Sequence, residues 1–158
     1  MTQIDLLRHG TVDGPAALYG RTDVCISDQG LKQMHKQMQH HPSPDNIISS
    51  PLRRCAELAT EYATFHEKEL QVYPGLRECD FGEWDGLTFE EIKAISPVLI
   101  STYTINPNAV TPPKGESLKS FSARIEAAIS DVLERHSGKR IVILCHGGVI
   151  RTAIAWCM

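Results

Sequence analysis

The sequence has no apolar run long enough to cross a membrane and no excess of positive charge. Its longest apolar stretches, such as Ile141 to Cys145, are far shorter than the roughly 18 residues that a membrane span requires. The 16 Lys and Arg residues stand against 19 Asp and Glu residues, and no basic run exceeds a pair. We therefore expect neither a membrane nor a nucleic acid among its partners. Because Met1 to Arg8 lacks the long apolar region of a signal peptide, we expect a cytoplasmic location.

The chain lacks any regular spacing of cysteines, and their arrangement excludes two further classes of protein. The chain has five cysteines, an odd number, and no C-x-x-C pair. This spacing fits neither a disulfide framework nor a zinc knuckle. Four of the seven histidines stand in polar helical or loop surroundings, and we expect these four on the solvated surface: His35, His40, His41 and His66. We accordingly expect no metal and no other cofactor.

The composition does provide enough apolar material for a core. Hydrophobic residues make up 42% of the chain and charged residues 22%, a balance typical of a globular protein rather than a disordered or low-complexity one. A length of 158 residues leaves little room for a second independent core. We therefore expect a single domain over residues 1–158.

Strand and helix signals alternate along the chain. Short apolar segments predict four strands, the first of them buried: Thr2–Leu7, Asn46–Ser49, Leu70–Tyr73 and Lys139–Cys145. Apolar residues at helical spacing predict helices that begin at Ser27 or Asp28, at Pro51, at Thr88, before Leu118 and after Gly148. The last strand is almost continuous Val, Ile and Leu, as in a central strand buried on both faces. This order predicts an α/β fold, a three-layer α/β/α sandwich with a mainly parallel central sheet.

Residues that could carry chemistry follow the first and last of these strands. Arg8-His9-Gly10 comes after the first, and His146-Gly147-Gly148 comes after the last. Ligands of open α/β sheets bind at the carboxyl ends of strands, so we expect His9 and His146 to share one crevice. Backbone amides at the helix start near Gly147 favour an anion, and Arg8 adds a fixed cation. Such a set suits a dianion of the size of phosphate.

Each of these motifs is weak alone, because a histidine after a strand is often only a hydrogen-bonded structural residue. Between the two histidines, however, the chain also carries Ser-Pro-Leu-Arg-Arg at residues 50–54, Leu-Arg-Glu at 76–78 and Phe-Gly at 81–82. With these motifs nearly the whole chain resembles the histidine phosphatase superfamily, the phosphoglycerate-mutase-like group. The segment Tyr-Gly-Arg-Thr-Asp at residues 19–23 makes it most similar to the alpha-ribazole phosphatases of cobalamin nucleotide-loop assembly.

The resemblance implies a phosphomonoesterase that hydrolyses a small phosphate ester. The resemblance to the alpha-ribazole phosphatases implies alpha-ribazole 5'-phosphate as the specific substrate. The reaction would pass through a phosphohistidine and need no metal. Three catalytic residues are implied, with His9 as nucleophile, Glu78 as acid and a protonated His146 in the phosphate pocket. The remaining candidates would bind the substrate: Arg8, Arg54, Gly147, Tyr19 and Gly20.

Elementary electrostatics is consistent with these implied roles. Nearby arginines disfavour an imidazolium ion, so His9 would keep its lone pair at neutral pH. Cationic groups around the nonbridging oxygens would do the work that Mg²⁺ does in other phosphoryl-transfer enzymes. A carboxylic acid beside a bound dianion tends to keep its proton, so Glu78 could protonate the leaving alkoxide and later activate water.

Spacing chooses between neighbouring candidates. The distance from the Ser-Pro-Leu motif favours Arg54 over Arg53, which we expect on the solvated side of its helix. The Leu-x-Glu match favours Glu78, so we interpret Glu83 and Asp85 as acids that structure the loop.

The chain also departs from the family pattern in two places. Thr11 and Val12 follow Arg-His-Gly, and Pro15 stands where mutases have asparagine, so we expect water rather than a second ester as the phosphoryl acceptor. The final apolar helix runs to Met158 without a capping signal or a following strand. Because family members continue further, we expect this chain to lack their C-terminal elements.

Two alternative functions remain open. Residues 145–152 also fit the Cys-x-x-Gly-x-x-Arg-Thr loop of cysteine-dependent phosphatases, with Cys145 as nucleophile and Arg151 as the phosphate clamp. That hypothesis leaves Arg8, Arg54 and Glu78 without a role. The other alternative is a domain that binds a phosphate ester without catalysis.

Overall fold

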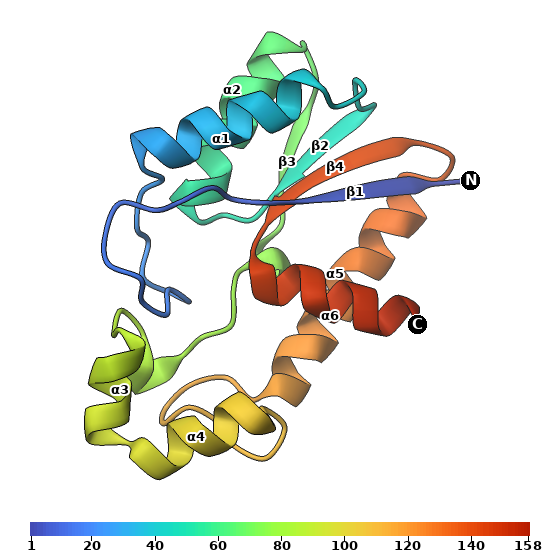
Figure 1. Cartoon of the computed structure of the whole chain (residues 1–158). Coiled ribbons are helices and arrows are strands. Elements are labelled where there is room, and N and C mark those ends of the chain that lie inside the picture. The colour runs from blue at the N-terminus through green and yellow to red at the C-terminus, as the bar shows by residue number, and fades with distance from the viewer.

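Four parallel strands form the central sheet of the computed structural model, which describes all of residues 1–158. They are β1 (Gln3–Arg8), β2 (Asn46–Ser49), β3 (Leu70–Val72) and β4 (Arg140–Cys145), in the order β1-β4-β2-β3 (Figure 1). From Ile141 to Cys145 every residue of β4 is buried, because this strand is paired on both edges and covered on both faces. The predicted parallel sheet with a buried last strand is confirmed.

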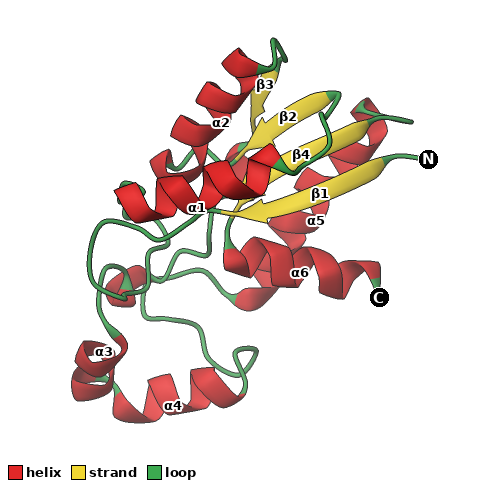
Figure 2. Cartoon of the chain, turned by 45° about the horizontal axis from the view of Figure 1, so that its top comes forward, coloured by secondary structure: helices red, strands yellow, loops and turns green.

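Helices cover both faces of this sheet (Figure 2). On one face, α1 (Asp28–Gln39) and α2 (Arg53–Phe65) pack against Ile47, Val142 and Leu144. On the other face, α5 (Leu118–Arg135) and α6 (Gly147–Cys157) pack against Ile48, Ile141 and Ile143. Successive strand residues point to opposite faces, so one continuous apolar run serves two core layers. The predicted three-layer α/β/α sandwich is confirmed.

A small helical unit stands apart from the sheet. It consists of α3 (Phe89–Ile95) and α4 (Pro97–Ile105), and the ribbon reaches it through the segments before α3 and after α4 (Figures 1 and 2). Trp84, Ile92 and Ile100 form its own buried cluster. Thr88 begins α3 with a capping box, in which its side chain and that of Glu91 each accept from the other's backbone N–H.

Several boundaries differ from the sequence prediction for physical reasons. The strand β1 is only half-buried, because it lies at the sheet edge and pairs only with β4. Pro51 lies before α2 rather than in its first turn, since Leu52 caps the helix. Pro97, which cannot donate a backbone hydrogen bond, begins a separate helix that was not predicted. His41 is not a solvated surface residue: its side chain is 15% exposed, and its Nε2 lies 3.4 Å from Asp5 Oδ2.

No helix of the chain combines the length and the apolar character that a membrane span requires.

Candidate active site

Three strands end at the same edge of the sheet and bring three polar side chains together. Arg8 at the end of β1 is in register with Cys145 at the end of β4, so the next residues, His9 and His146, are neighbours. Their ring centroids are 5.2 Å apart. Ser50 follows β2, and its backbone N–H donates to the carbonyl of Leu144. The two histidines are therefore neighbours, but the predicted shared crevice is not found, because only His9 lines a cavity and His146 is buried beside it.

The imidazole of His9 is held in one tautomer by its own loop. Its Nδ1 lies 2.8 Å from the carbonyl oxygen of Gly10, and a carbonyl can only accept, so Nδ1 carries the proton and donates it. Nε2 then keeps its lone pair. Burial lowers the pKa of His9 to about 4, and the charges of Arg54 and Arg8 act in the same direction, whereas the bond to Gly10 opposes them. The ring is therefore neutral at pH 7.

His146 is fully buried and is neutral in this structure. Its Nε2 lies 2.7 Å from Ser50 Oγ, which also accepts the N–H of Leu52. Burial, together with the positive charge of Arg54, lowers the pKa of His146 to about 2. The expectation of a protonated His146 does not hold for this state, because the ring is dry and faces cations with no anion to offset them.

Arg54 is anchored in the first turn of α2, and one of its three guanidinium nitrogens has no partner. It is 1% exposed, and its Nη1 and Nη2 donate to the carbonyls of Thr22 and Tyr19 at 3.0 and 2.7 Å. Its Nε has no hydrogen-bond partner, an uncommon condition for a buried guanidinium. Arg53 is instead on the exposed side and pairs with Glu57 at 2.7 Å. The predicted exposure of Arg53 is confirmed, and the role of Arg54 in a phosphate pocket stays a prediction.

Glu78 lies where an irregular segment passes the start of α6. Its Oε1 accepts from the N–H of Cys79 and its Oε2 from the N–H of Gly148, both at 3.0 Å. A Cβ on Gly148 would collide with the Glu78 carboxylate, so glycine is required for this approach. The helix start was expected to receive a bound anion, but the N–H of Gly148 already holds this carboxylate.

A cavity of about 660 Å³ opens in front of His9. Its wall includes most of the sequence-predicted residues: Arg8, His9, Tyr19, Glu78 and Gly147. His146 and Arg54 do not form part of this wall, since both are almost completely buried beside it. Gly20 does not line the cavity either. Its backbone N–H donates to the carboxylate of Asp85. Tyr19 directs its hydroxyl to the carbonyl of Pro15.

A second cavity of about 690 Å³ adjoins the first and is largely apolar. Five residues belong to the walls of both cavities: Leu18, Glu78, Phe81, Phe89 and Arg151. The second is lined further by aromatic and aliphatic side chains: Ile100, Tyr103, Leu118, Phe121 and Trp156. Glu78 thus lies where the cavity that contains His9 meets the more apolar one.

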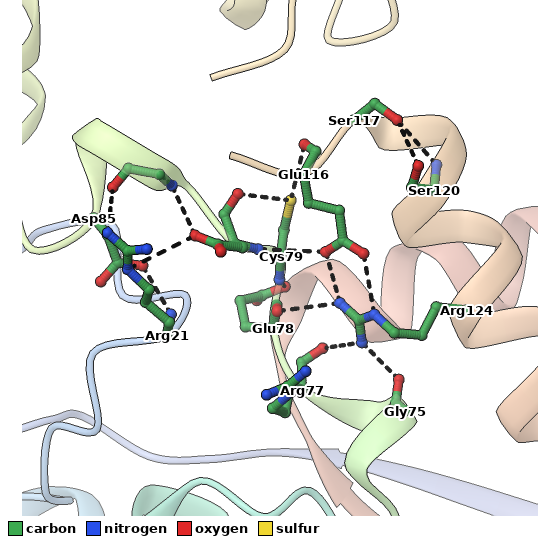
Figure 3. Close-up of polar contacts among 12 residues, drawn as sticks. Arg21, Gly75, Arg77, Glu78, Cys79, Asp85, Glu116, Ser117, Ser120 and Arg124 are labelled. Atoms are coloured by element: carbon green, nitrogen blue, oxygen red, sulfur yellow. Dashed lines mark hydrogen bonds and ion pairs between the residues drawn. The ribbon is translucent and has the colours of Figure 1, made fainter. Parts of the chain in front are cut away.

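Asp85 organises the loop that holds Arg54. Its carboxylate accepts from three consecutive backbone N–H groups, those of Gly20, Arg21 and Thr22, at 2.8 to 3.0 Å. Figure 3 shows Asp85 beside Arg21. The carbonyls of the same loop accept hydrogen bonds from Arg54. Asp85 therefore fixes the Arg54 guanidinium indirectly, through the backbone of this loop. The interpretation of Asp85 as a loop-structuring acid is confirmed.

Sequence reasoning did not identify Ser50 as the partner of His146. The signal was present, because Ser50 opens the motif that was used only to locate Arg54. Such a partner depends on strand order, which places β2 directly beside β4.

The cysteine alternative has little support from the geometry. Cys145 is completely buried in the apolar core and does not line the cavity, and burial raises the pKa of its thiol to about 12. A thiol becomes a strong nucleophile only as the thiolate, which these surroundings disfavour. No group of three or more His, Cys, Asp or Glu side chains is arranged to hold a metal ion.

Comparison with known proteins agrees with this geometry. Residues 4–158 match the histidine phosphatase superfamily (branch 1). Phosphoglycerate mutase-like protein 4 of Arabidopsis thaliana is 31% identical over 157 residues, or 95% of this chain and 68% of that protein. The metal-independent phosphoserine phosphatase of Arabidopsis thaliana is 29% identical, over 96% of this chain and 66% of its own length.

The chain is also similar to a further curated phosphatase and to a solved structure. The adenosylcobalamin/alpha-ribazole phosphatase of Escherichia coli is 26% identical, over 95% of this chain and 76% of its own length. The solved structure of Bacillus stearothermophilus YhfR shares the fold with a TM-score of 0.92 at 24% identity, over 99% of this chain and 79% of that one. With the family match extending over almost every residue, the chain belongs to the histidine phosphatase superfamily.

Proposed function

We propose that the chain hydrolyses a small phosphate monoester through a phosphohistidine at His9. The observation that carries this proposal is the lock of His9 Nδ1 on the carbonyl of Gly10, which leaves an unprotonated Nε2 beside two arginines at an open cavity. Nε2 attacks phosphorus and forms the P–N bond while the P–O bond to the leaving group breaks. Water then attacks the same phosphorus, the P–N bond breaks and its electron pair returns to Nε2.

The phosphoryl group would be bound by cations on the side of His9. The unpartnered Nε of Arg54 and the guanidinium of Arg8 supply charge-assisted donors, and Gly147 leaves space beside Arg8 for the approach of an oxygen. His146 is neutral before binding, and a dianion beside its ring stabilises the imidazolium form. In this proposal His146 takes up a proton as the substrate binds and then donates a hydrogen bond to the phosphoryl oxygen.

Glu78 is proposed as the proton donor and acceptor of the two half-reactions. As a carboxylic acid it gives its proton to the leaving oxygen, and as a carboxylate it removes a proton from the attacking water. Its place in the walls of both cavities supports this role, because the leaving group would extend from the cavity that contains His9 past Glu78 into the more apolar one.

Metal independence is tested by activity on p-nitrophenyl phosphate in excess EDTA. We expect full activity, because in this proposal arginine and histidine side chains neutralise the phosphoryl oxygens. Activity that EDTA abolishes and a divalent cation restores would contradict the arginine-based mechanism.

We propose alpha-ribazole 5'-phosphate as the substrate to test first. Support comes from the similarity to the Escherichia coli enzyme and from the aromatic lining of the second cavity, which suits an aromatic base. The comparison should include phosphoserine, since a phosphoserine phosphatase is also among the relatives. We expect alpha-ribazole 5'-phosphate to have the highest kcat/KM. A phosphoserine value far above it would reject the narrow substrate and keep the general reaction.

A further inference from the structure

The backbone that carries Glu78 is held by the side chain of one arginine on α5. Arg124 Nη1 donates to the carbonyls of Gly75 and Arg77 at 2.6 and 3.0 Å, and its Nη2 reaches the carbonyl of Glu78 at 3.4 Å (Figure 3). These carbonyls belong to the segment after β3, which contains a short 3-10 helix, η1 (Pro74–Leu76), and pairs with no strand. A planar guanidinium can contact several carbonyls at once in a fixed geometry.

Glu116 fixes the orientation of this guanidinium. Its two carboxylate oxygens accept from Nε and Nη2 of Arg124 at 3.1 and 2.7 Å, a bidentate arrangement. The Arg124 and Glu116 side chains are only 23% and 17% exposed, unlike a surface ion pair of small energetic value. Backbone bonds join Glu116 to the same segment, because its N–H donates to the carbonyl of Asp80 at 2.8 Å. The guanidinium carbon Cζ of Arg124 lies 5.0 Å from the centroid of the Phe121 ring.

Glu78 is therefore fixed at both ends. The amides of Cys79 and Gly148 hold its carboxylate, and the Arg124–Glu116 pair holds its backbone. Proton transfer to a leaving oxygen requires hydrogen-bond distance, and a displacement of about 1 Å can cost about 100-fold in rate.

We propose that Arg124, held by Glu116, is a positioning residue for the carboxylate of Glu78. The proposal rests on the role of Glu78 given above. Arg124 touches neither substrate nor phosphate; it sets the distance between the Glu78 carboxylate and the leaving oxygen.

The leaving group gives a readout that a purely structural role would not affect. An alkyl ester such as glycerol 2-phosphate needs protonation of its leaving alkoxide, whereas the weakly basic p-nitrophenolate leaves without it. For Arg124→Met we expect the rate of phosphoenzyme formation from glycerol 2-phosphate, measured by rapid quench in a single turnover, to fall about 10- to 100-fold, up to the lower end of what general acid catalysis supplies. The same rate from p-nitrophenyl phosphate should fall less than about 3-fold, because its leaving group needs no proton. The later attack of water, in which Glu78 acts as the base, is common to both esters and does not enter this rate. KM for both esters should change less than about 3-fold, because Arg124 lines neither cavity.

Two conservative variants and one matched control complete the experiment. Arg124→Lys and Glu116→Gln should show the same selectivity in weaker form. If thermal unfolding shows that Arg124→Met does not fold, either of these two variants can replace it. Arg135→Met removes another ion-paired arginine of the same helix, which pairs with Asp131 at 2.8 Å. Arg135→Met should leave the rate of phosphoenzyme formation unchanged for both glycerol 2-phosphate and p-nitrophenyl phosphate.

The outcomes separate this proposal from the proposed function. If Glu78→Gln slows phosphoenzyme formation selectively from glycerol 2-phosphate while the Arg124 and Glu116 variants slow it equally from both esters, the positioning role is wrong and the acid role stands. If Glu78→Gln shows no selectivity for the leaving group in the rate of phosphoenzyme formation, both are wrong. Selective loss in all of these variants, with no further loss when Glu78→Gln and Arg124→Met are combined, is the result that we expect.

Discussion

The two histidines of the site differ from the others in their surroundings. His9, in the wall of the cavity, and His146, fully buried beside it, both lie near arginines, and burial lowers the pKa of both. By contrast, the rings of His35 and His41 lie 3.6 and 3.4 Å from the carboxylates of Glu61 and Asp5. One residue type is therefore neutral in one place, as the proposed nucleophile requires, and lies beside a carboxylate in another.

The first prediction compares the two candidate nucleophiles by mutation. His9→Ala should lower kcat by about 1,000-fold or more, because it removes the covalent path. Cys145→Ser should keep activity within about 3-fold, because the thiol is buried away from the cavity and is not required to ionise. Both values come from kcat on p-nitrophenyl phosphate. An active His9→Ala beside an inactive Cys145→Ser would reverse the assignment.

Among the elements, the sheet was predictable and the irregular segments were not. The periodicity of α1, α2 and α5 and the apolar run of β4 are local signals, and all four elements lie within a few residues of the prediction. The site residues after β1 and β4 followed from the rule that ligands bind at strand ends. The contacts of Asp85 and Arg124 join residues 46 to 65 positions apart, and no local pattern encodes such pairs.

The second prediction concerns the loop that holds Arg54. Asp85→Ala removes the acceptor of three backbone N–H groups, so the carbonyls that anchor Arg54 should lose their fixed position. We expect KM for p-nitrophenyl phosphate to rise about 10-fold, comparable to the loss of one hydrogen bond to a charged group. Glu83→Ala is the matched control, because Glu83 pairs only with the exposed Lys114 and should leave KM within about 2-fold. Equal effects of the two substitutions would contradict this account.

For the whole molecule, the buried imidazoles couple stability to pH. The pKa of His9 is about 4 and that of His146 about 2 in the folded chain, both below the ordinary value of 6.5 that applies after unfolding. Below pH 6.5 the unfolded chain therefore binds more protons than the folded one, and the free energy of unfolding falls as the pH falls. The slope that His146 alone contributes rises as the pH falls below 6.5 and approaches about 1.4 kcal/mol per pH unit near pH 5.

The third prediction follows from that slope. Urea unfolding between pH 6.5 and pH 5 should show a steady loss of stability towards the acid side. His146→Asn should be less stable at pH 6.5, but its stability should depend less on pH, because one of the two imidazoles is gone. A free energy of unfolding that is constant over this range, or an unchanged slope in the variant, would show that His146 does not remain neutral in the folded chain.

The central claim is that the phosphoryl group passes through His9, and rapid quenching with labelled substrate tests it most directly. Chain quenched during turnover of a ³²P-labelled ester should carry a label that is stable to base and lost in acid, and it should map to the peptide that contains Arg8-His9-Gly10. His9→Ala, treated in the same way, should carry none. Label on the peptide of Cys145, or turnover with full label in His9→Ala, would contradict the claim.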